Sequence, residues 1–316
     1  MTRTIWALSV GLLLGCGPSR MHAPTYAGEE PEPEVDEAAE APPPAPRRQH
    51  RAVAQPYLWR VGSGARPSYL FGTMHVGVAF DEAFPADGLE HIDAARIVFQ
   101  EVDPEAGTLA ALAENASLPI NKILEDYITP RAMYRLSNEL LHVTDVSRLP
   151  NLRPWVSMIF LQQKRADAIR SGGLAHSMDE EFHRYVQQQG VHFQPLETVE
   201  DQAVALGSVS DEIMGHIVRD MVLEPERLNR ELDALIEAYL SGDAAEVRML
   251  LHDNGDAGVR AFHAALFDGR SERWFEVIEP ELEEGGLFVA VGLGHILGPG
   301  GLLRRLRQAG HAVERL

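Results

Sequence analysis

The apolar residues of this chain form short strand-like runs near both ends of a long region in which they recur at helical spacing. Continuous apolar runs of about four to eight residues, bounded by glycine or proline, are typical of strands buried inside a sheet. The runs that favour strands are residues 57–61, 69–75, 96–103, 191–196, 287–291 and 312–316.

Apolar positions spaced three and four residues apart predict helices over most of the remaining chain. These helices are expected at residues 87–95, 131–142, 153–171, 177–189, 228–240, 244–251, 259–267 and 299–309, with two more beginning at Thr198 and Arg270. The order of elements predicts an α/β (α+β) fold. We expect a central mixed β-sheet with strands from both ends of the chain, flanked by helices with a large helical insert.

Two of the strand runs break into the same motif, Gly-x-x-His. Gly72 leads to His75 in the first run, and Gly292 leads to His295 in the second. Glycine has no Cβ, so the backbone can turn tightly where the strand leaves the sheet. The imidazole that follows is displayed at the C-terminal edge of the strand, where open α/β sheets place their ligands. The repeated motif therefore predicts one site built from both ends of the chain.

Two carboxylates follow strand runs in a similar way. Glu101 lies near the end of the run at 96–103, and Glu197 lies just before the helix that Thr198 is expected to cap. A carboxylate buried in such a position needs a cation, a metal or an imidazole as its partner. Two other interpretations stay open: Glu101 is an exposed residue of the sheet edge, or Glu197 complements a helix dipole.

The first 16 residues have the pattern of a bacterial lipoprotein signal peptide. Arg3 precedes an apolar run at 5–14, which is too short to span a bilayer but has the length of a signal-peptide core. Residues 13–16, LLGC, resemble a lipobox, in which the cysteine is lipidated after cleavage. Cys16 is the only cysteine of the chain, so no disulfide is possible. The alternative is an ordinary thiol.

Residues 17–54 are expected to be a disordered tether, and residues 55–316 the folded domain. The tether is acidic and rich in proline, without periodic apolar positions. We interpret it as a solvated spacer, with the binding of a partner as the alternative. The formal net charge of −19 argues against nucleic acid and against docking on an anionic membrane through a basic patch.

Taken together, these residues resemble the TraB/GumN family, which includes the Tiki proteins and is considered distantly related to erythromycin-esterase-like and ChaN-like proteins. The resemblance spans residues 57–316. The matching segments are 58–59, 69–75, 99–103, 178–179, 196–198, Gln202, 291–295, 300–303 and Gly310. The chain departs from the family pattern at Arg270-Ser271, where the family usually has Arg-Asn, and at Gln100, where it usually has a hydrophobic or charged residue.

The resemblance implies a metal-dependent hydrolase of the peptidase type, because Tiki proteins are described as metal-dependent proteases that use both motifs and a glutamate. It implies that His75, Glu101 and His295 are catalytic and hold a divalent Mn, Co or Zn ion. Two imidazoles and one carboxylate are a usual ligand set for a catalytic metal. Glu197 is then a catalytic general base, or it orients a ligand histidine.

Two further functions stay open at this point. In a metal-free hydrolase, as in the esterase-like relatives, a histidine acts as base and the glutamate orients it. In a non-catalytic protein, the domain sequesters a peptide or haem. We expect a peptide or protein substrate, no nucleic acid, and a lipid-anchored place in the bacterial cell envelope, at the outer membrane or the periplasmic face.

The other histidines of the helical region lack metal-ligand spacing. The chain has no His-Glu-x-x-His motif, so a metal site would be assembled from distant strand ends. We interpret His176 and His183 as surface or packing histidines.

Overall fold

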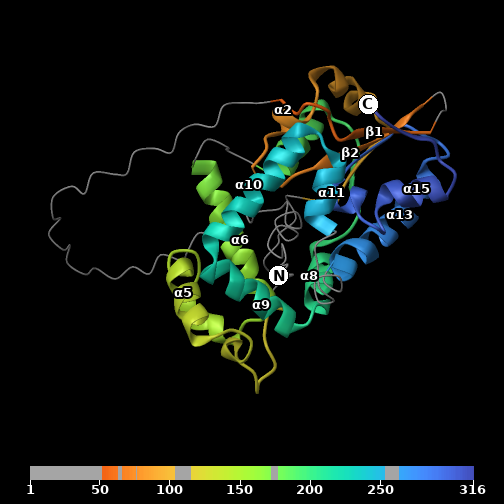
Figure 1. Ribbon diagram of the computed structural model, residues 1–316. Coiled ribbons are helices and arrows are strands. Elements are labelled where there is room, and N and C mark those ends of the chain that lie inside the picture. The colour runs from red at the N-terminus through yellow and green to blue at the C-terminus, as the bar shows by residue number, and fades with distance from the viewer. Residues whose placement is uncertain (1–51, 63–65, 76, 104–114, 172–176, 253–262) are drawn as a thin grey trace, which may run out of the picture.

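The computed structural model of the chain contains one β-sheet with helices on both of its faces (Figure 1). It describes residues 52–316 except 63–65, 76, 104–114, 172–176 and 253–262. The predicted signal peptide and all but the end of the predicted tether lie outside the described residues, as do His176 and the first part, 259–262, of the helix expected at 259–267.

The sheet has six strands in the order β4-β3-β5-β2-β1-β6. Their bounds are β1 Leu58–Val61, β2 Ser68–Thr73, β3 Ile97–Gln100, β4 Phe193–Pro195, β5 Leu287–Gly292 and β6 Val313–Arg315. The neighbours β4, β3, β5 and β2 are parallel, whereas β1 pairs antiparallel with both β2 and β6. The predicted mixed sheet with strands from both ends of the chain is therefore confirmed.

The strand β5 carries the second motif into the centre of the sheet. It lies between β3 and β2, and its residues Val291 and Gly292 pair with Gly72 and Thr73 of the first motif. Because these strands are parallel, their C-terminal ends reach the same edge of the sheet.

Most of the helices predicted from apolar spacing are present, some with shifted bounds, and the 13-residue α9 and several short helices are additional. The described helices are α2 Phe80–Ala83, α3 Leu89–Asp93, α5 Pro130–Leu140, α6 Pro154–Ser171, α7 Met178–Gln189, α8 Val199–Ser208, α9 Asp211–Leu223, α10 Pro225–Ser241, α11 Ala244–His252, α13 Gly269–Glu281, α14 Leu293–Leu297 and α15 Leu302–Gln308. Short 3-10 segments lie at Ala86–Gly88, Leu124–Asp126 and Val146–Asn151, and a π-helical turn lies at Ala264–Asp268. No helix among the described residues is both long and apolar enough to span a membrane.

Local capping explains where two of the predicted helices begin and end. Ser177 accepts a hydrogen bond from the backbone of Glu180 at the start of α7, and Gly190 ends that helix in the left-handed conformation. Thr198 caps α8 in the same way as Ser177 caps α7. These caps matter for function because both helices begin next to the carboxyl edge of the sheet.

The helical insert has its own hydrophobic core. Helices α5, α6 and α9 pack around buried side chains that include Leu136, Trp155 and Ile217, away from the sheet (Figure 1). A second core covers the sheet and includes Phe71 and Phe288. The predicted large helical insert is thus a separately packed half of the molecule.

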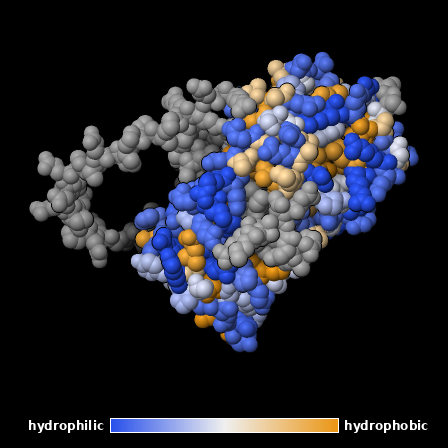
Figure 2. Space-filling view, viewed as in Figure 1, coloured by the Kyte–Doolittle hydropathy of each residue, from blue (hydrophilic) through white to orange (hydrophobic). Residues whose placement is uncertain are grey.

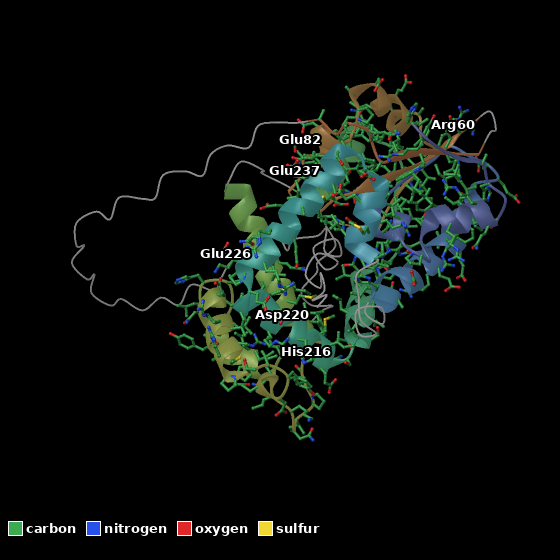
Figure 3. The ribbon with its side chains drawn as sticks, viewed as in Figure 1. Arg60, Glu82, His216, Asp220, Glu226 and Glu237 are labelled. Atoms are coloured by element: carbon green, nitrogen blue, oxygen red, sulfur yellow. The ribbon has the colours of Figure 1, made fainter. Side chains whose placement is uncertain are left out.

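One long helix joins the two halves. The N-terminal part of α10 contributes Leu228 to the insert core, and its C-terminal part contributes Leu235 and Tyr239 to the sheet core. Glu226 and Glu237, labelled in Figure 3, mark the two ends of this helix. The hydroxyl of Tyr239 donates a hydrogen bond of 2.7 Å to the carbonyl of Gly72. The helix is therefore tied directly to the first Gly-x-x-His segment.

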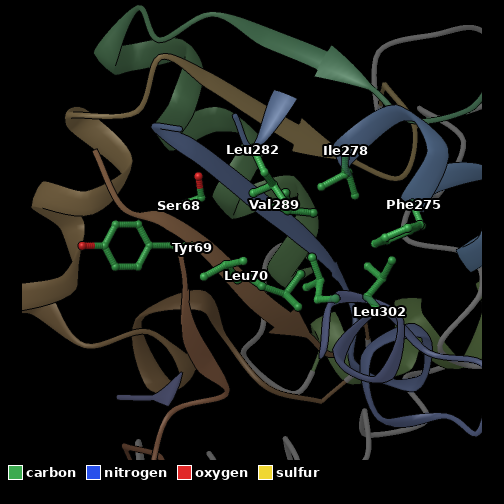
Figure 4. Close-up of a pocket in the computed structure, with 10 residues that line it drawn as sticks. Ser68, Tyr69, Leu70, Phe275, Ile278, Leu282, Val289 and Leu302 are labelled. Atoms are coloured by element: carbon green, nitrogen blue, oxygen red, sulfur yellow. The ribbon is translucent and has the colours of Figure 1, made fainter. Parts of the chain in front are cut away.

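Different helices cover the two faces of the sheet. On one face, Phe71 contacts aromatic rings of α2 and α7, and Tyr69 stacks on His91 of α3. On the other face, α13 and α15 leave a shallow apolar crevice over β1, β2 and β5 (Figure 4). Ser68 is the only polar group besides the Tyr69 hydroxyl among its lining residues, and Figure 4 shows Tyr69 pointing away. This crevice therefore lacks the groups needed for acid–base or metal chemistry.

The outer surface is mostly polar on the side seen in Figure 2. Hydrophilic residues cover most of this face, and hydrophobic residues form separate small areas. This distribution agrees with the net charge of −19.

The structure corrects two expectations about the glycine motifs. Neither Gly72 nor Gly292 has a positive φ. Gly72 does not turn the chain out of the sheet, whereas Gly292 ends β5 and is the N-cap of α14. Gly72 lies inside β2, and a Cβ there would lie 2.5 Å from Cδ1 of Leu293. Its role is close packing of β2 against α14. The second correction concerns His295, which lies on the short helix α14 and not at a bare strand end.

We expect Gly72→Ala to destabilise the fold by about 1–3 kcal/mol, because the new methyl group overpacks a buried contact. Gly207→Ala is the matched control, since only the tip of the Arg153 side chain lies near that position on α8, at 3.2 Å. Alanine is favoured over glycine in a helix, so this control should be neutral or stabilising. Denaturant unfolding measures both, and equal effects would contradict the packing role of Gly72.

Candidate functional site

The four residues predicted for the site lie where parallel strands end. Glu101 follows β3 directly, and His75 and Glu197 each follow their strands, β2 and β4, by two residues. His295 is the third residue of α14, which begins immediately after β5. All four side chains are buried, and His295 has no exposed surface.

The structure brings both histidines to one oxygen of Glu101. The distance from Nε2 of His75 to Oε1 of Glu101 is 3.9 Å, and the distance from Nε2 of His295 to the same oxygen is 4.0 Å. Oε1 also accepts a hydrogen bond of 2.8 Å from the backbone N–H of Gly292. Burial raises the pKa of Glu101, although the nearby Arg270 and His75 oppose this rise. Glu101 is thus the centre of a cluster assembled from both motifs.

A buried arginine holds the cluster together. Arg270, the second residue of α13, donates through Nε to both oxygens of Glu197, at 2.9 and 3.1 Å. Its Nη2 donates to Oε2 of Glu101 at 2.8 Å and also contacts Glu197. Its Nη1 lies 3.1 Å from Nε2 of His295. The planar guanidinium fork can bind two carboxylates at once, which a lysine could not do with the same geometry.

Glu197 binds this arginine and not the histidines. Besides Arg270, it accepts a hydrogen bond of 3.2 Å from Nε1 of Trp274, and its backbone N–H donates to the carbonyl of Glu101. Among the described residues, no contact joins the carboxylate of Glu197 to His75 or His295. In this structure Glu197 therefore positions Arg270, and its predicted action as a base has no contact here to support it.

His75 is oriented by a carboxylate that the sequence did not single out for the site. Its Nδ1 contacts Oδ2 of Asp179, in the first turn of α7. Within the described part of the chain, Nε2 of His75 has no hydrogen-bond partner. Burial lowers the pKa of His75, but the charge and hydrogen bond of Asp179, together with Glu101, outweigh burial and raise this pKa. Buried polar groups usually have a hydrogen-bond partner, so this ring nitrogen, which faces Glu101, is an exception in the cluster.

His295 is neutral and has a defined tautomer. Arg270 can only donate, so Nε2 of His295 accepts and Nδ1 carries the proton. Nδ1 lies 3.0 Å from Oγ of Ser271, whose hydroxyl can donate onward to the carbonyl of His295 at 3.5 Å. Burial, with Arg270 and His75 nearby, holds the pKa of His295 well below its usual value. Ser271 therefore orients the ring of His295 through its contact with Nδ1.

The atom types, the two Nε2–Oε1 distances and the charge of the cluster suit a divalent cation. Two ligand atoms that lie about 2.1 Å from one metal are about 3–4 Å apart, and both imidazole Nε2 atoms lie at such a distance from Glu101. The other ring nitrogen of each histidine is held by Asp179 or Ser271, as is usual for metal-ligating histidines. With neutral histidines, the carboxylates of Asp179, Glu101 and Glu197 exceed the one guanidinium by two negative charges.

One contact opposes this fit. Among the described residues, no group of three or more histidine, cysteine, aspartate or glutamate side chains is arranged so that it could hold a metal ion. Arg270 accounts for this, because its Nη1 lies on Nε2 of His295. A cation held by all three predicted ligands would have to displace Arg270 from Nε2 of His295. The other two ligand atoms, Nε2 of His75 and Oε1 of Glu101, have no hydrogen bond to Arg270 in the part of the chain that the structure describes, so they would bind a cation without losing one.

The sequence did not reveal several residues of this cluster as site residues. Asp179 and Arg270 had been noted only as parts of matching or departing segments, and Trp274 only as part of a helix. His183, interpreted as a surface or packing histidine, is buried and bonded to Gln100. The available signal was the family resemblance, because Asp179 lies in a matching segment and Arg270 in a departing one.

A buried hydroxyl near the first motif also lacks a partner. Among the described residues, Oγ1 of Thr73 has no hydrogen bond and no exposure. We therefore expect Thr73→Val to stabilise the fold by up to about 1 kcal/mol, because an unpaired buried hydroxyl is replaced by a methyl group. Thr198→Val is the matched control and should cost about 1 kcal/mol through loss of the α8 cap. A loss of stability in Thr73→Val, measured by denaturant unfolding, would contradict the unpaired state.

A buried cluster of histidine, carboxylate and guanidinium at the carboxyl ends of parallel strands is an arrangement typical of a binding or catalytic centre in an α+β domain. Residues 57–315 match the TraB/PrgY/gumN family, and the chain belongs to this family. The resemblance drawn from the motifs is thereby confirmed. Comparison with curated proteins and with solved structures gives no match.

Proposed function

We propose that this chain is a metal-dependent hydrolase acting on peptide or protein substrates. One observation carries the proposal: Nε2 of His75 and Nε2 of His295 lie 3.9 and 4.0 Å from the same oxygen of Glu101, while the other nitrogen of each ring is held by another side chain. Membership of the TraB/PrgY/gumN family supports it.

In this proposal His75, Glu101 and His295 hold a divalent ion. Such an ion, when bound, lowers the pKa of water and polarises a substrate carbonyl. Asp179 keeps Nε2 of His75 directed at Glu101, and Ser271 does the same for His295. Arg270 fixes Glu101 through Oε2 and leaves Oε1 facing the two histidines. The buried position of these groups strengthens their electrostatic interactions.

A metal-free hydrolase is the second candidate. The contact between Arg270 and Nε2 of His295 favours it, because that nitrogen is then already occupied. His75 would act as general base, oriented by Asp179, and Arg270 would stabilise negative charge that develops on the substrate.

The test combines metal analysis of the purified chain with turnover of a peptide library. We expect bound Mn, Co or Zn, loss of turnover on chelation, and recovery when the metal is restored. His75→Ala and His295→Ala should each lower turnover by a factor of about 10² or more. His216→Ala is the matched control, because His216 is an exposed histidine on α9 (Figure 3). Turnover that survives chelation selects the metal-free mechanism. Absence of both metal and turnover leaves a non-catalytic binding domain.

We further propose that the mature chain is anchored in the bacterial cell envelope by a lipid on Cys16. The LLGC segment at 13–16 and the preceding apolar run support this, and the acidic segment that follows would hold the domain away from the membrane. We expect the wild-type chain in the membrane fraction, and Cys16→Ser in the soluble fraction or retained as precursor. Wild-type protein found entirely in the soluble fraction would refute the anchor.

A further inference from the structure

A second polar network lies directly behind Asp179. Gln100, the last residue of β3, donates from Nε2 to the backbone carbonyl of Asp179 at 3.2 Å. Its Oε1 lies 3.0 Å from Nδ1 of His183, and Nε2 of His183 lies 2.9 Å from Nε2 of Gln187. Gln100 and His183 are both buried, with 2% and 4% exposure. The network therefore joins the end of β3 to the first three turns of α7.

The donors and acceptors of this network are consistent with one arrangement. If the amide of Gln100 donates to Asp179, its oxygen accepts from Nδ1–H of His183. Nε2 of His183 then accepts from the amide of Gln187. No atom of Gln100 is left without a partner, which is the condition for a buried polar group to define a unique geometry.

The spacing of residues along α7 explains why Gln100 can bond to this helix at two positions. Asp179, His183 and Gln187 are four residues apart, so they lie on one face of α7, one turn above another. Gln100 contacts the first two of them. Its neighbour Glu101 is the residue that faces both motif histidines. Consecutive residues of β3 thus hold both Asp179 and the centre of the cluster.

We propose that Gln100 and His183 are positioning residues that fix Asp179 against His75. The hydrogen bond from the amide of Gln100 fixes the position of the first turn of α7 relative to β3. His183 fixes the orientation of that amide. The carboxylate of Asp179 is then held where it binds Nδ1 of His75, and Nε2 of His75 is directed toward Glu101. The effect on turnover rests on the proposed hydrolase function, but the placement of His75 does not.

The test follows the Nδ1–H proton of His75 by NMR. A buried imidazole proton bonded to a carboxylate gives a low-field signal that exchanges slowly with water, and its absence from His75→Ala assigns it. In Gln100→Leu we expect this proton to exchange at least tenfold faster, or its signal to vanish. Gln100→Glu, which keeps an acceptor for His183 but cannot donate to Asp179, should resemble Gln100→Leu. Gln194→Leu, an exposed glutamine on β4, is the matched control and should leave the signal unchanged.

A second variant separates positioning from general destabilisation. Gln100→Leu/His183→Leu removes both partners, so no buried imidazole is left unpaired, yet Asp179 still loses its anchor. The His75 signal should stay weakened in this double variant. Its return would overturn the proposal, as would a wild-type signal in Gln100→Leu. If the chain hydrolyses peptides, kcat of Gln100→Leu should fall at least tenfold with KM changed less than threefold. Absence of hydrolysis would refute the proposed function and leave the NMR result to decide the role of Gln100.

Discussion

Replacing Arg270 by leucine is expected to destabilise the fold by about 3–5 kcal/mol, because it leaves buried carboxylates without their cation. Arg270 is 2% exposed and binds Glu101 and Glu197 together. Among the described residues, Trp274 would still donate a hydrogen bond to Glu197, and the N–H of Gly292 would still donate to Glu101. The change should therefore exceed the effect of any surface ion pair.

Denaturant unfolding of three variants tests this expectation. Arg273→Leu is the matched control on the same helix, since its side chain is 54% exposed and lies 4.0 Å from Glu197. This control should cost less than about 1 kcal/mol. Arg270→Leu/Glu197→Gln should recover part of the loss, because one buried charge is removed with the cation. Equal effects of Arg270→Leu and Arg273→Leu would show that Arg270 is not the buried partner of two carboxylates.

Acid should destabilise the chain through His252 and His263. Burial lowers the pKa of each to about 4, and their rings lie 5.5 Å apart. An unfolded histidine titrates near its usual value of about 6.5, so between about pH 6.5 and pH 4 the unfolded state binds protons that the folded state does not. Stability contributed by these groups is therefore intact above pH 6.5 and decreases as the pH falls toward 4.

At pH 5 the expected loss is about 1–2 kcal/mol for His252, allowing for its partial exposure. Comparing unfolding free energies at pH 7 and pH 5 for the wild type and His252→Gln isolates this contribution. The variant should lose less stability than the wild type over the same interval. His216→Gln, at an exposed position, should behave as the wild type. An unchanged pH dependence in His252→Gln would contradict the lowered pKa.

The sequence predicted the elements that local patterns specify. The strand runs, the helix at 177–189 and the Thr198 cap depend on neighbouring residues, and all are present in the structure. The meeting of His75, Glu101 and His295 could be anticipated from strand ends, because parallel strands share an edge. Their roles as ligands or catalysts stay predictions.

The remaining part of the cluster depends on contacts that no local pattern contains. Arg270 reaches Glu101 across 169 positions of sequence, and His75 reaches Asp179 across 104. The short helix α14 was missed because its five residues continue an apolar strand run. The departure at Gln100 was visible in the sequence, but its bond to His183 required the packing of α7 on β3.

The helix α10 spans both hydrophobic cores of the molecule. Its 17 residues make it about 25 Å long at a rise of about 1.5 Å per residue. One end is anchored among the side chains of the insert, and the other end is bonded through Tyr239 to Gly72. A single helix therefore connects the side chains packed in the insert to the strand that precedes His75.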